Sequence, residues 1–129
     1  MDVTPLIPEG RQIIQSYSHG RFKISGHEYY GPVIVLPDAV IEWNVDGTAA
    51  DLDVTSFSQA ALLAEALDVV LLGTGAQMEF VPPSVRGALK DNGITLDVMD
   101  TGAACRTYNV LMAEGRRIAA LLLPVKAED

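Results

Sequence analysis

Two glycine-containing loops are the first candidates for chemistry in this sequence. Gly73-Thr74-Gly75 follows an apolar run that is typical of a strand, and Asp100-Thr101-Gly102 follows the next such run. Backbone N–H groups in a glycine-rich turn after a strand can bind an anion. Because open α/β sheets bind ligands at the carboxyl ends of their strands, the two loops predict a ligand-binding edge if the strands are neighbours.

The first loop is an incomplete nucleotide-binding motif. The dinucleotide fingerprint requires a third glycine three residues after Gly75, and this position holds Met78. The next predicted helix begins late, behind Pro82-Pro83, and no Lys-Ser/Thr pair follows to complete a phosphate-binding P-loop. We therefore favour a smaller anion over a nucleotide. The simpler alternative is that the glycines permit a sharp exit from a buried strand.

Cys105 lies in the first turn of a predicted helix, next to Arg106. A helix N-terminus and an adjacent cation both lower the pKa of a thiol and favour a reactive thiolate. Helical geometry, however, places Cys105 at the rim of an apolar stripe that contains Ala104 and Tyr108, and the chain has no second cysteine. We expect a small buried side chain here rather than a nucleophile, and we predict no catalytic residue.

Arg106 and Asn109 are three residues apart and share one face of that helix. Asparagine is a poor helix former, so Asn109 in mid-helix indicates a specific hydrogen-bonding role. Two roles are open: Asn109 ties a neighbouring loop backbone to the helix, which is commoner, or it binds a ligand. Thr101 has a similar choice, since capping the helix would by itself explain it. The candidate ligand-binding residues are Gly73, Thr74, Gly75, Thr101, Arg106 and Asn109.

Neither histidine completes a metal or catalytic site. His19 and His27 are eight residues apart in the N-terminal half, with only Glu28 close by. This spacing does not supply a metal-ligand set, and no route from the histidines to Cys105 is evident. We predict no metal and no cofactor.

The elements that must position these residues alternate along the second half of the chain. Three apolar runs predict strands, at Val69–Leu72, Ile94–Val98 and Ile118–Leu123. Two segments with helical spacing separate them, PPSVRGALKDN and AACRTYNVLMAEG. Pro82-Pro83 and Asn92-Gly93 mark the ends of the first helix, and Thr101 and Gly115 those of the second. The order strand–helix–strand–helix–strand predicts parallel pairing through right-handed crossovers.

The first half has β patterning after an irregular lead-in, residues 1–10. Strands are predicted at Ile13–Tyr17, Arg21–Ile24, Val33–Leu36 and Val40–Val45. Ser56 and Gln59 form a predicted capping box for a helix with an apolar stripe of Leu62, Leu63, Ala66 and Leu67. The predicted fold class is a mixed α/β single domain over residues 1–129, an N-terminal β-meander followed by β-α-β-α-β with a partly parallel sheet.

Composition and charge restrict the function classes. The chain has 129 residues and a formal net charge of −8, so its surface repels nucleic-acid phosphates and we exclude nucleic acid as a partner. The longest apolar run, Ile118–Val125, is far too short to span a bilayer, and Met1-Asp2 shows no start of a signal peptide. A single cysteine fits a reducing cytosol. We expect a soluble cytoplasmic protein with no transmembrane segment.

Aromatic residues of the first half are candidates for a protein interface. Tyr29, Tyr30 and Trp43 fall where one sheet face has no predicted helix to cover it. Aromatic residues on an uncovered face commonly anchor protein interfaces, but the same residue types are ordinary core. Both interpretations stay open. Homodimerisation suits a small domain, although no feature of the sequence indicates it.

The residues described above resemble the MTH 938-like proteins, a domain of unknown function (DUF 498). The resemblance runs from about Ile13 to Pro124, over HGRFKISGHEYYGPVIVLPDAVIEW, VVLLGTG and VMDTGAACRTYNVLMAEGRRIAALLLP. Its most specific parts are LLGTG and RTYNVLMAEGRRIAALL. Matching motif residues are Gly73, Thr74, Gly75, Thr101, Arg106, Thr107, Tyr108, Asn109, Glu114 and Arg116. The chain looks like a stand-alone bacterial member, without the Arg-rich presequence of a mitochondrial import substrate.

The resemblance implies a single α/β domain with a hammerhead-like excursion in its β half. It also implies relatives that include a mitochondrial complex I assembly factor and an adipogenesis-associated cytosolic protein, and it supplies no catalytic residue. The predicted function is a non-enzymatic assembly or interaction factor with a protein partner, linked to biogenesis of a respiratory complex. The alternative is a small-anion or ligand-binding protein, or a weak enzyme, that uses the edge formed by Gly73–Gly75 and Asp100–Asn109.

Overall fold

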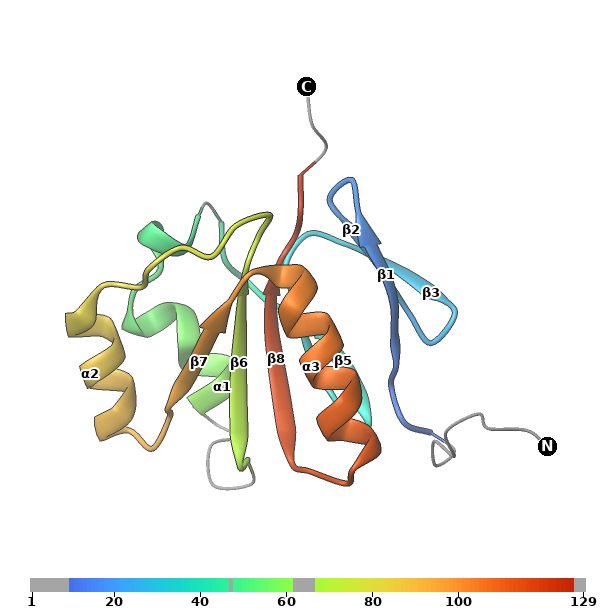
Figure 1. Cartoon of the computed structure of the whole chain (residues 1–129). Coiled ribbons are helices and arrows are strands. Elements are labelled where there is room, and N and C mark those ends of the chain that lie inside the picture. The colour runs from blue at the N-terminus through green and yellow to red at the C-terminus, as the bar shows by residue number, and fades with distance from the viewer. Residues whose placement is uncertain (1–9, 47, 62–66, 127–129) are drawn as a thin grey trace.

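The sequence IAALLL at Ile118–Leu123 forms β8, the central strand of a five-stranded sheet in the computed structural model of the chain (Figure 1). The structure describes residues 10–46, 48–61 and 67–126. Every residue of β8 is buried, because other elements cover both faces of this sheet. A strand between two covered faces is expected to be apolar throughout, as this strand is.

The remaining elements form a second sheet and the helices. In chain order they are β1 (Ile14–Ser18), β2 (Arg21–Ile24), β3 (His27–Tyr30), β4 (Val33–Leu36), β5 (Ala39–Glu42), η1 (Ala49–Asp51), η2 (Val54–Phe57), α1 (Ser58–Ala61), β6 (Val69–Thr74), α2 (Pro83–Asp91), β7 (Leu96–Met99) and α3 (Thr101–Ala113). The strand orders are β1-β2-β3 and β5-β4-β8-β6-β7. β6 is parallel to β7 and β8, and the other pairs are antiparallel. The predicted fold class, mixed α/β with a partly parallel sheet, is confirmed.

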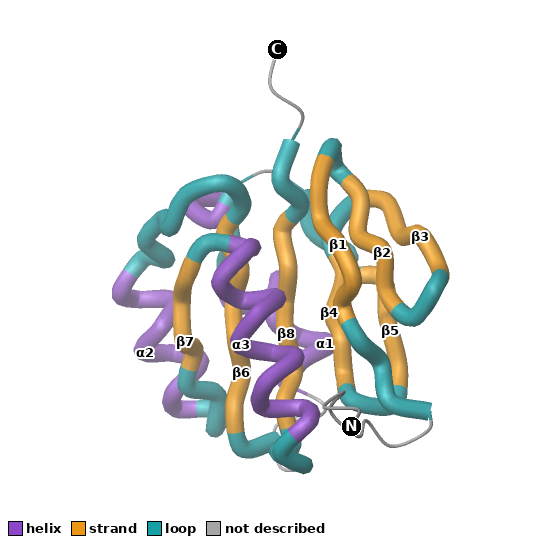
Figure 2. Tube along the Cα trace, turned by 45° about the vertical axis from the view of Figure 1, so that its right-hand side comes forward, coloured by secondary structure: helices purple, strands orange, loops and turns teal. Residues whose placement is uncertain are grey.

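Alternation along the central strands divides the core into two layers. Leu121 faces a layer that includes Val85 of α2, whereas Leu122 faces a layer that includes Tyr108 of α3. Phe22 of the three-stranded sheet belongs to the second layer, so this small sheet shares a face of the large one with α3. Figure 2 shows α3 in front of the large sheet and α1 behind it.

Both ends of α2 and the C-terminal end of α3 are confirmed, and residues with distinctive backbone preferences set them. Pro83 is the first residue of α2, and Asn92 caps its C-terminus. Gly93 follows that cap with a φ of 83°, and Gly115 follows the end of α3 with a φ of 80°. Residues that carry a Cβ rarely adopt this left-handed backbone, so each glycine ends its helix at a defined position.

The predicted capping box of Ser56 and Gln59 is wrong. Asp53 is the cap: its Oδ1 accepts from the Ser56 N–H at 3.0 Å, and the Ser56 Oγ accepts from the Asp53 N–H at 3.0 Å. A carboxylate is the stronger acceptor, so the helical segment begins three residues earlier, as the 3₁₀ turn η2. The Gln59 side chain instead bonds the end of β5, where it accepts from the Asn44 N–H at 3.1 Å and donates to the Glu42 carbonyl oxygen at 3.0 Å.

The first half contains a strand that was not predicted, and its strands are divided between the two sheets. β3 pairs with β2 after a turn at Ser25-Gly26, where both residues have positive φ. β5 ends at Glu42, although a strand up to Val45 was predicted. The chain leaves the strand at Trp43, whose Nε1 donates to the Ser56 carbonyl oxygen at 2.7 Å.

Some predictions lie outside the described residues, namely those for residues 1–9 and for Leu62, Leu63 and Ala66 of the first helix. Leu67 is described and is partly buried against the core, as expected. Across the described ranges, no helix combines the length and the apolar character that crossing a membrane requires.

The three aromatic residues considered as interface anchors have different environments. Trp43 is buried against Phe57, with ring centroids 5.8 Å apart, and Tyr29 is partly buried in the layer that contains α3. Tyr30 is 70% exposed, and its hydroxyl donates to the Glu28 Oε2 at 3.1 Å. Trp43 is therefore a core residue, and of the three only Tyr30 has an exposed ring.

Asn109 joins the three-stranded sheet to the rest of the fold. Its Nδ2 donates to the Ile14 carbonyl oxygen at 2.8 Å, and its Oδ1 accepts from the Ile14 N–H at 2.9 Å. The side-chain amide of an α3 residue thus pairs with both backbone groups of one β1 residue, as a neighbouring strand would. This is the backbone-tying role that the sequence favoured, and it explains an asparagine in mid-helix.

We expect Asn109→Ala to lower the free energy of unfolding by about 2–3 kcal/mol, because both backbone groups of Ile14 lose their partner. Urea denaturation followed by circular dichroism measures this difference. Val110→Ala, at an exposed position of the same helix, is the matched control and should change the unfolding free energy by less than about 0.5 kcal/mol. Equal stability of Asn109→Ala and the wild type would contradict this role.

Candidate functional site

The two glycine-containing loops lie side by side at one edge of the five-stranded sheet. β6 and β7 are parallel neighbours, and Gly73 of β6 is opposite Met99 of β7. The loops follow directly, and the Thr101 N–H donates to the Gly75 carbonyl oxygen at 2.9 Å. The predicted convergence of the loops is therefore confirmed.

Thr101 does not cap α3, so its predicted capping role is wrong. Asp100 is the cap, with its Oδ1 accepting from the Ala103 N–H at 2.9 Å. This leaves the fully buried Thr101 hydroxyl to donate to the Leu123 carbonyl oxygen at 2.6 Å and to accept from the Gly75 N–H at 2.8 Å. One hydroxyl thus joins the carboxyl ends of β6 and β8 to the first residue of α3.

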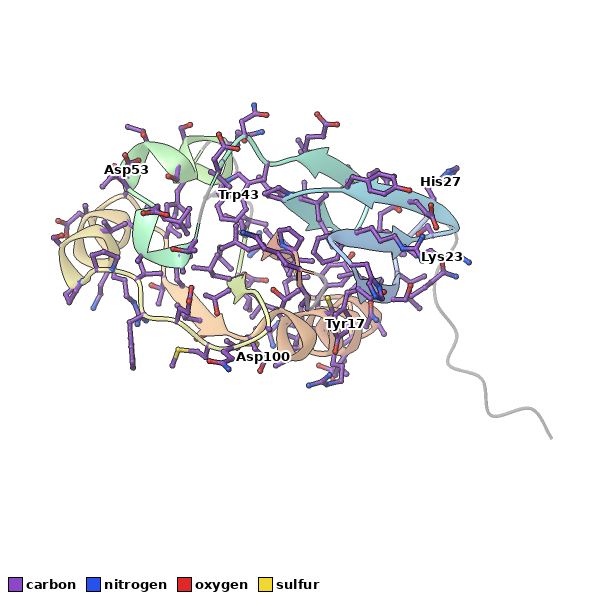
Figure 3. The ribbon with its side chains drawn as sticks, turned by 90° about the horizontal axis from the view of Figure 1, so that it is seen from above. Tyr17, Lys23, His27, Trp43, Asp53 and Asp100 are labelled. Carbon is purple, nitrogen blue, oxygen red and sulfur yellow. The ribbon has the colours of Figure 1, made fainter. Side chains whose placement is uncertain are left out.

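The close approach of α3 to β6 requires glycine at position 73. A Cβ on Gly73 would lie 2.9 Å from the Thr101 Cα and 3.0 Å from its Oγ1. A Cβ on Gly102 would collide with the Tyr17 hydroxyl, and Figure 3 shows Tyr17 beside α3, near the helix end that Asp100 caps. Both glycines therefore allow close packing, which is a structural role.

The Thr74 hydroxyl organises the chain between β6 and α2. It donates to the Gln77 carbonyl oxygen at 2.7 Å and accepts from the Glu79 N–H at 3.0 Å, so the loop folds back over the strand end. The Gly75 N–H is already donated to Thr101. The anion cradle expected at this turn therefore lacks the Gly75 donor.

A cavity of about 340 Å³ lies at this edge of the sheet. Thr74 and Gly75 line it, together with Asp46, Glu79, Lys126 and apolar residues at the end of β8. Among the described residues, the ionisable groups of its wall are two carboxylates and one ammonium group. Because carboxylates repel an anion, this cavity suits an uncharged or cationic ligand better than the predicted small anion.

The structure does not bring Arg106 and Asn109 to this cavity. Arg106 is exposed on α3, where its Nη1 lies 3.4 Å from the hydroxyl of Tyr17, and Asn109 is bonded to β1. Of the six predicted residues, Thr74 and Gly75 line the cavity. A ligand-binding role for the six stays a prediction, and the geometry does not unite them in one site.

Cys105 is a buried thiol, as expected. Burial raises the pKa of Cys105 to about 12, and the opposing effect of Arg106 is smaller. His27 lies at the outer tip of the three-stranded sheet, far along it from α3 (Figure 3). Within the part of the chain that the structure describes, no three His, Cys, Asp or Glu side chains are grouped to hold a metal ion.

Tyr108 has a polar role that was not predicted from its place in an apolar stripe. Its buried hydroxyl bonds to the carbonyl oxygens of Gln12 at 2.8 Å and Leu36 at 3.1 Å, and burial raises the pKa of the phenol. It thereby connects α3 to the segment before β1 and to the end of β4. The sequence offers one signal of this role: the apolar stripe contains a tyrosine and not a phenylalanine, and a buried phenol needs a hydrogen-bond partner.

Thr101→Val should lower the free energy of unfolding by about 3 kcal/mol, because the nearly isosteric side chain leaves the Gly75 N–H and the Leu123 carbonyl group buried without a partner. Thr101→Ser keeps the hydroxyl and should lose only about 1 kcal/mol for the missing methyl group. Urea denaturation of the three proteins tests this order, and a valine variant as stable as the serine variant would refute it.

Native Cys105 should react with iodoacetamide at pH 8 at least about a thousandfold more slowly than the same cysteine in urea. Burial raises the pKa of the thiol to about 12 in the folded chain, so the fraction of thiolate at pH 8 is very small. Mass spectrometry of timed samples gives both rates. Similar rates in the native and unfolded chain would contradict the buried position.

Comparison with known proteins places the chain in a family. Residues 14–123 match the family described as "Protein of unknown function (DUF498/DUF598)". A zebrafish (Danio rerio) protein named NADH dehydrogenase (ubiquinone) 1 alpha subcomplex assembly factor 3 is 44% identical over 115 residues, which cover 89% of this chain and 66% of that protein. The chain thus spans just under two thirds of the length of this curated relative, and 62% of the mouse protein of the same name.

Two solved structures share the fold. A protein from Bordetella parapertussis superposes with a TM-score of 0.79 at 35% identity, covering 91% of this chain and 99% of its own. A Bordetella pertussis protein described as a Mth938-like domain has a TM-score of 0.79 at 28% identity, covering 99% of this chain and 95% of its own. The chain therefore belongs to the DUF498/DUF598 family of proteins with the Mth938-like fold.

Proposed function

We propose that this protein is a non-enzymatic assembly factor that binds a subunit of a respiratory NADH dehydrogenase complex. The zebrafish and mouse relatives carry the name of such an assembly factor and are 44% and 40% identical to this chain over 89% of its length. Because the chain covers less than two thirds of those proteins, the proposal concerns the shared domain. We further propose a bacterial, cytoplasmic setting, in keeping with a single cysteine. Homodimerisation stays a prediction.

The observation that carries the proposal is the exposure of Phe80. Its side chain is 78% exposed, and Met78 is 47% exposed on the same connection from β6 to α2 (Figure 1). Aromatic residues and methionine are enriched at protein interfaces, and exposed apolar groups close together mark interaction surfaces. Glu79 lies between Met78 and Phe80, and its N–H donates to the Thr74 hydroxyl. This hydrogen bond holds the backbone that carries both exposed side chains.

The polar side chains of α3 support a binding role over a catalytic one. The Thr101 hydroxyl, the Asn109 amide and the Tyr108 hydroxyl all bond to backbone groups of neighbouring elements. The thiol of Cys105 is buried and its pKa is raised, so it is unsuited to nucleophilic attack. Each of these side chains supports the fold.

A second candidate function is the binding of a small ligand in the cavity lined by Thr74 and Gly75. Its volume of about 340 Å³ falls in the range of small-molecule sites. Asp46 and Glu79 in its wall favour a ligand with an ammonium group. Backbone amide shifts of residues 74–79 in an NMR titration with benzylamine would support this function, and unchanged shifts would exclude such a ligand.

In the source organism, deletion of the gene should reduce the amount of assembled NADH dehydrogenase, and the wild-type gene should restore it. A Met78→Ser/Phe80→Ser variant should fail to restore the complex, because the interface loses its apolar anchors. Native gel electrophoresis with staining for NADH dehydrogenase activity measures assembly.

Val110→Ser is the matched control, because Val110 is 58% exposed on α3 and lies outside the β6–α2 loop. It should restore assembly as well as the wild type does. A photo-crosslinking residue at position 80 should also capture a subunit of the complex, whereas one at Tyr30 should not. Normal assembly in the deletion strain would refute the proposed function, and full rescue by the double variant would refute the proposed surface.

A further inference from the structure

A second cavity, of about 310 Å³, lies at the opposite edge of the five-stranded sheet. Three arginines line it, Arg11, Arg116 and Arg117, together with the carboxylate of Asp38. The rest of its wall is mainly apolar and comes from the end of β4 and the start of β8. We call it the arginine pocket.

The wall that carries Arg11 and Asp38 is fixed to the core. The Gln12 N–H donates to the Pro37 carbonyl oxygen at 2.8 Å, so the segment before β1 is bonded to the β4–β5 turn. The buried Tyr108 hydroxyl forms hydrogen bonds with the carbonyl oxygens of Gln12 and Leu36. The residues next to Arg11 and Asp38 therefore have defined positions before any ligand binds.

The opposite wall is also held in place. Arg117 bonds Asp68 through its Nε at 3.1 Å and its Nη2 at 2.6 Å, and this guanidinium holds the pKa of Asp68 below its usual range. The Arg117 carbonyl oxygen accepts from the N–H groups of Asp68 and Val69. A bidentate pair of this kind fixes the direction of the guanidinium plane.

The C-terminus of α3 ends beside Arg116, and helix C-termini repel anions when their carbonyl groups are free. Here the chain itself provides donors for three of these carbonyl groups, those of Val110, Leu111 and Met112. The Gly115 N–H donates to the Met112 carbonyl oxygen at 3.0 Å, and the Arg116 N–H donates to the Leu111 carbonyl oxygen at 3.0 Å. These carbonyl oxygens therefore already accept hydrogen bonds within the chain, and they are not free acceptors in the pocket wall.

The charge of the arginine pocket differs from that of the whole chain. The chain has a formal net charge of −8, yet three of its nine basic residues meet at this cavity. Among the described residues that line the pocket, Asp38 is the one acid; of the three arginines, Arg117 is in an ion pair, with Asp68. Counted over these described groups, three positive charges meet two carboxylates in an acidic protein.

We propose that the arginine pocket binds a small ligand that carries an oxyanion group, a phosphate or a carboxylate, on an apolar body. The planar guanidinium group matches both oxyanions with paired donors. The partly buried Pro37 and Leu67 of the wall contact the body of the ligand, and the cavity volume suits a small molecule. This site is separate from the Met78–Phe80 loop, so it can succeed or fail independently of the assembly function.

NMR titration of the full ¹⁵N-labelled chain tests the proposal with three probes that share an apolar ring. Phenyl phosphate and phenylacetate present the two oxyanions, and benzylamine presents the opposite charge. We expect the two anions to shift the amides of Asp38, Arg116 and Ile118, with benzylamine leaving them unchanged. The stronger of the two anions identifies the oxyanion that the pocket prefers. Inorganic phosphate should bind more weakly than phenyl phosphate, because it leaves the apolar wall uncovered.

Arg11→Ala and Arg116→Ala should each weaken binding of the preferred anion about tenfold, since each removes charged hydrogen bonds. Arg21→Ala is the matched control, because Arg21 is exposed on β2 and paired with Glu28 at 3.2 Å. It should leave the affinity unchanged, and thermal unfolding confirms that all three variants are folded. Equal losses in all three variants, anion-induced shifts confined to residues 74–79, or equal shifts of the amides of Asp38, Arg116 and Ile118 by benzylamine would each overturn the proposal.

Discussion

The arrangement of the large sheet depends on the hydroxyl of Thr101, because buried backbone groups at one edge need hydrogen-bond partners and this hydroxyl supplies them. β6 and β8 end at the same edge, and α3 begins there, so backbone groups of all three elements are brought out of water together. An unpaired buried backbone group is costly, and a threonine hydroxyl can donate and accept at once. Thr101 bonds Leu123 and Gly75 in this way. The glycine at position 73 follows from the same contact, because no Cβ fits between β6 and the helix.

This joint, formed by the hydrogen bonds of Thr101 with Gly75 and Leu123, explains why this edge of the sheet differs from the ligand-binding edges of many open α/β sheets. There, the carboxyl ends of parallel strands leave backbone donors free for a ligand. Here, Thr101 and Thr74 take up donors of the loop that follows β6, and Asp100 takes up one at the start of α3. The groups suited to contact other molecules lie away from the joint, in the apolar side chains of the β6–α2 loop and in the arginines of the opposite edge.

Features with a local cause were predicted well, and features with competing local causes were not. Pro83 and Gly93 limit α2 through their own backbone preferences, and both ends were predicted. At α3, Asp100 and Thr101 are adjacent and both can cap, so local chemistry alone does not choose between them. The contact with Leu123, 22 residues away, assigns the hydroxyl to the joint and leaves the cap to Asp100. At η2, Asp53 and Ser56 can both cap; the carboxylate of Asp53 takes this role, and Gln59 bonds Asn44 and Glu42 instead.

The sequence was enough to predict the alternation of strands and helices, the parallel pairing, the buried stripe of α3 and the family, because these depend on periodicity and on motifs that are contiguous in the chain. Which polar residues are partners depends instead on how the elements pack in three dimensions. Asn109 and Ile14 are 95 residues apart, and Arg11 and Arg116 meet across a cavity formed by elements from both halves. Such pairs depend on how the three-stranded sheet and α3 pack on the same face of the large sheet, and no local pattern encodes that packing.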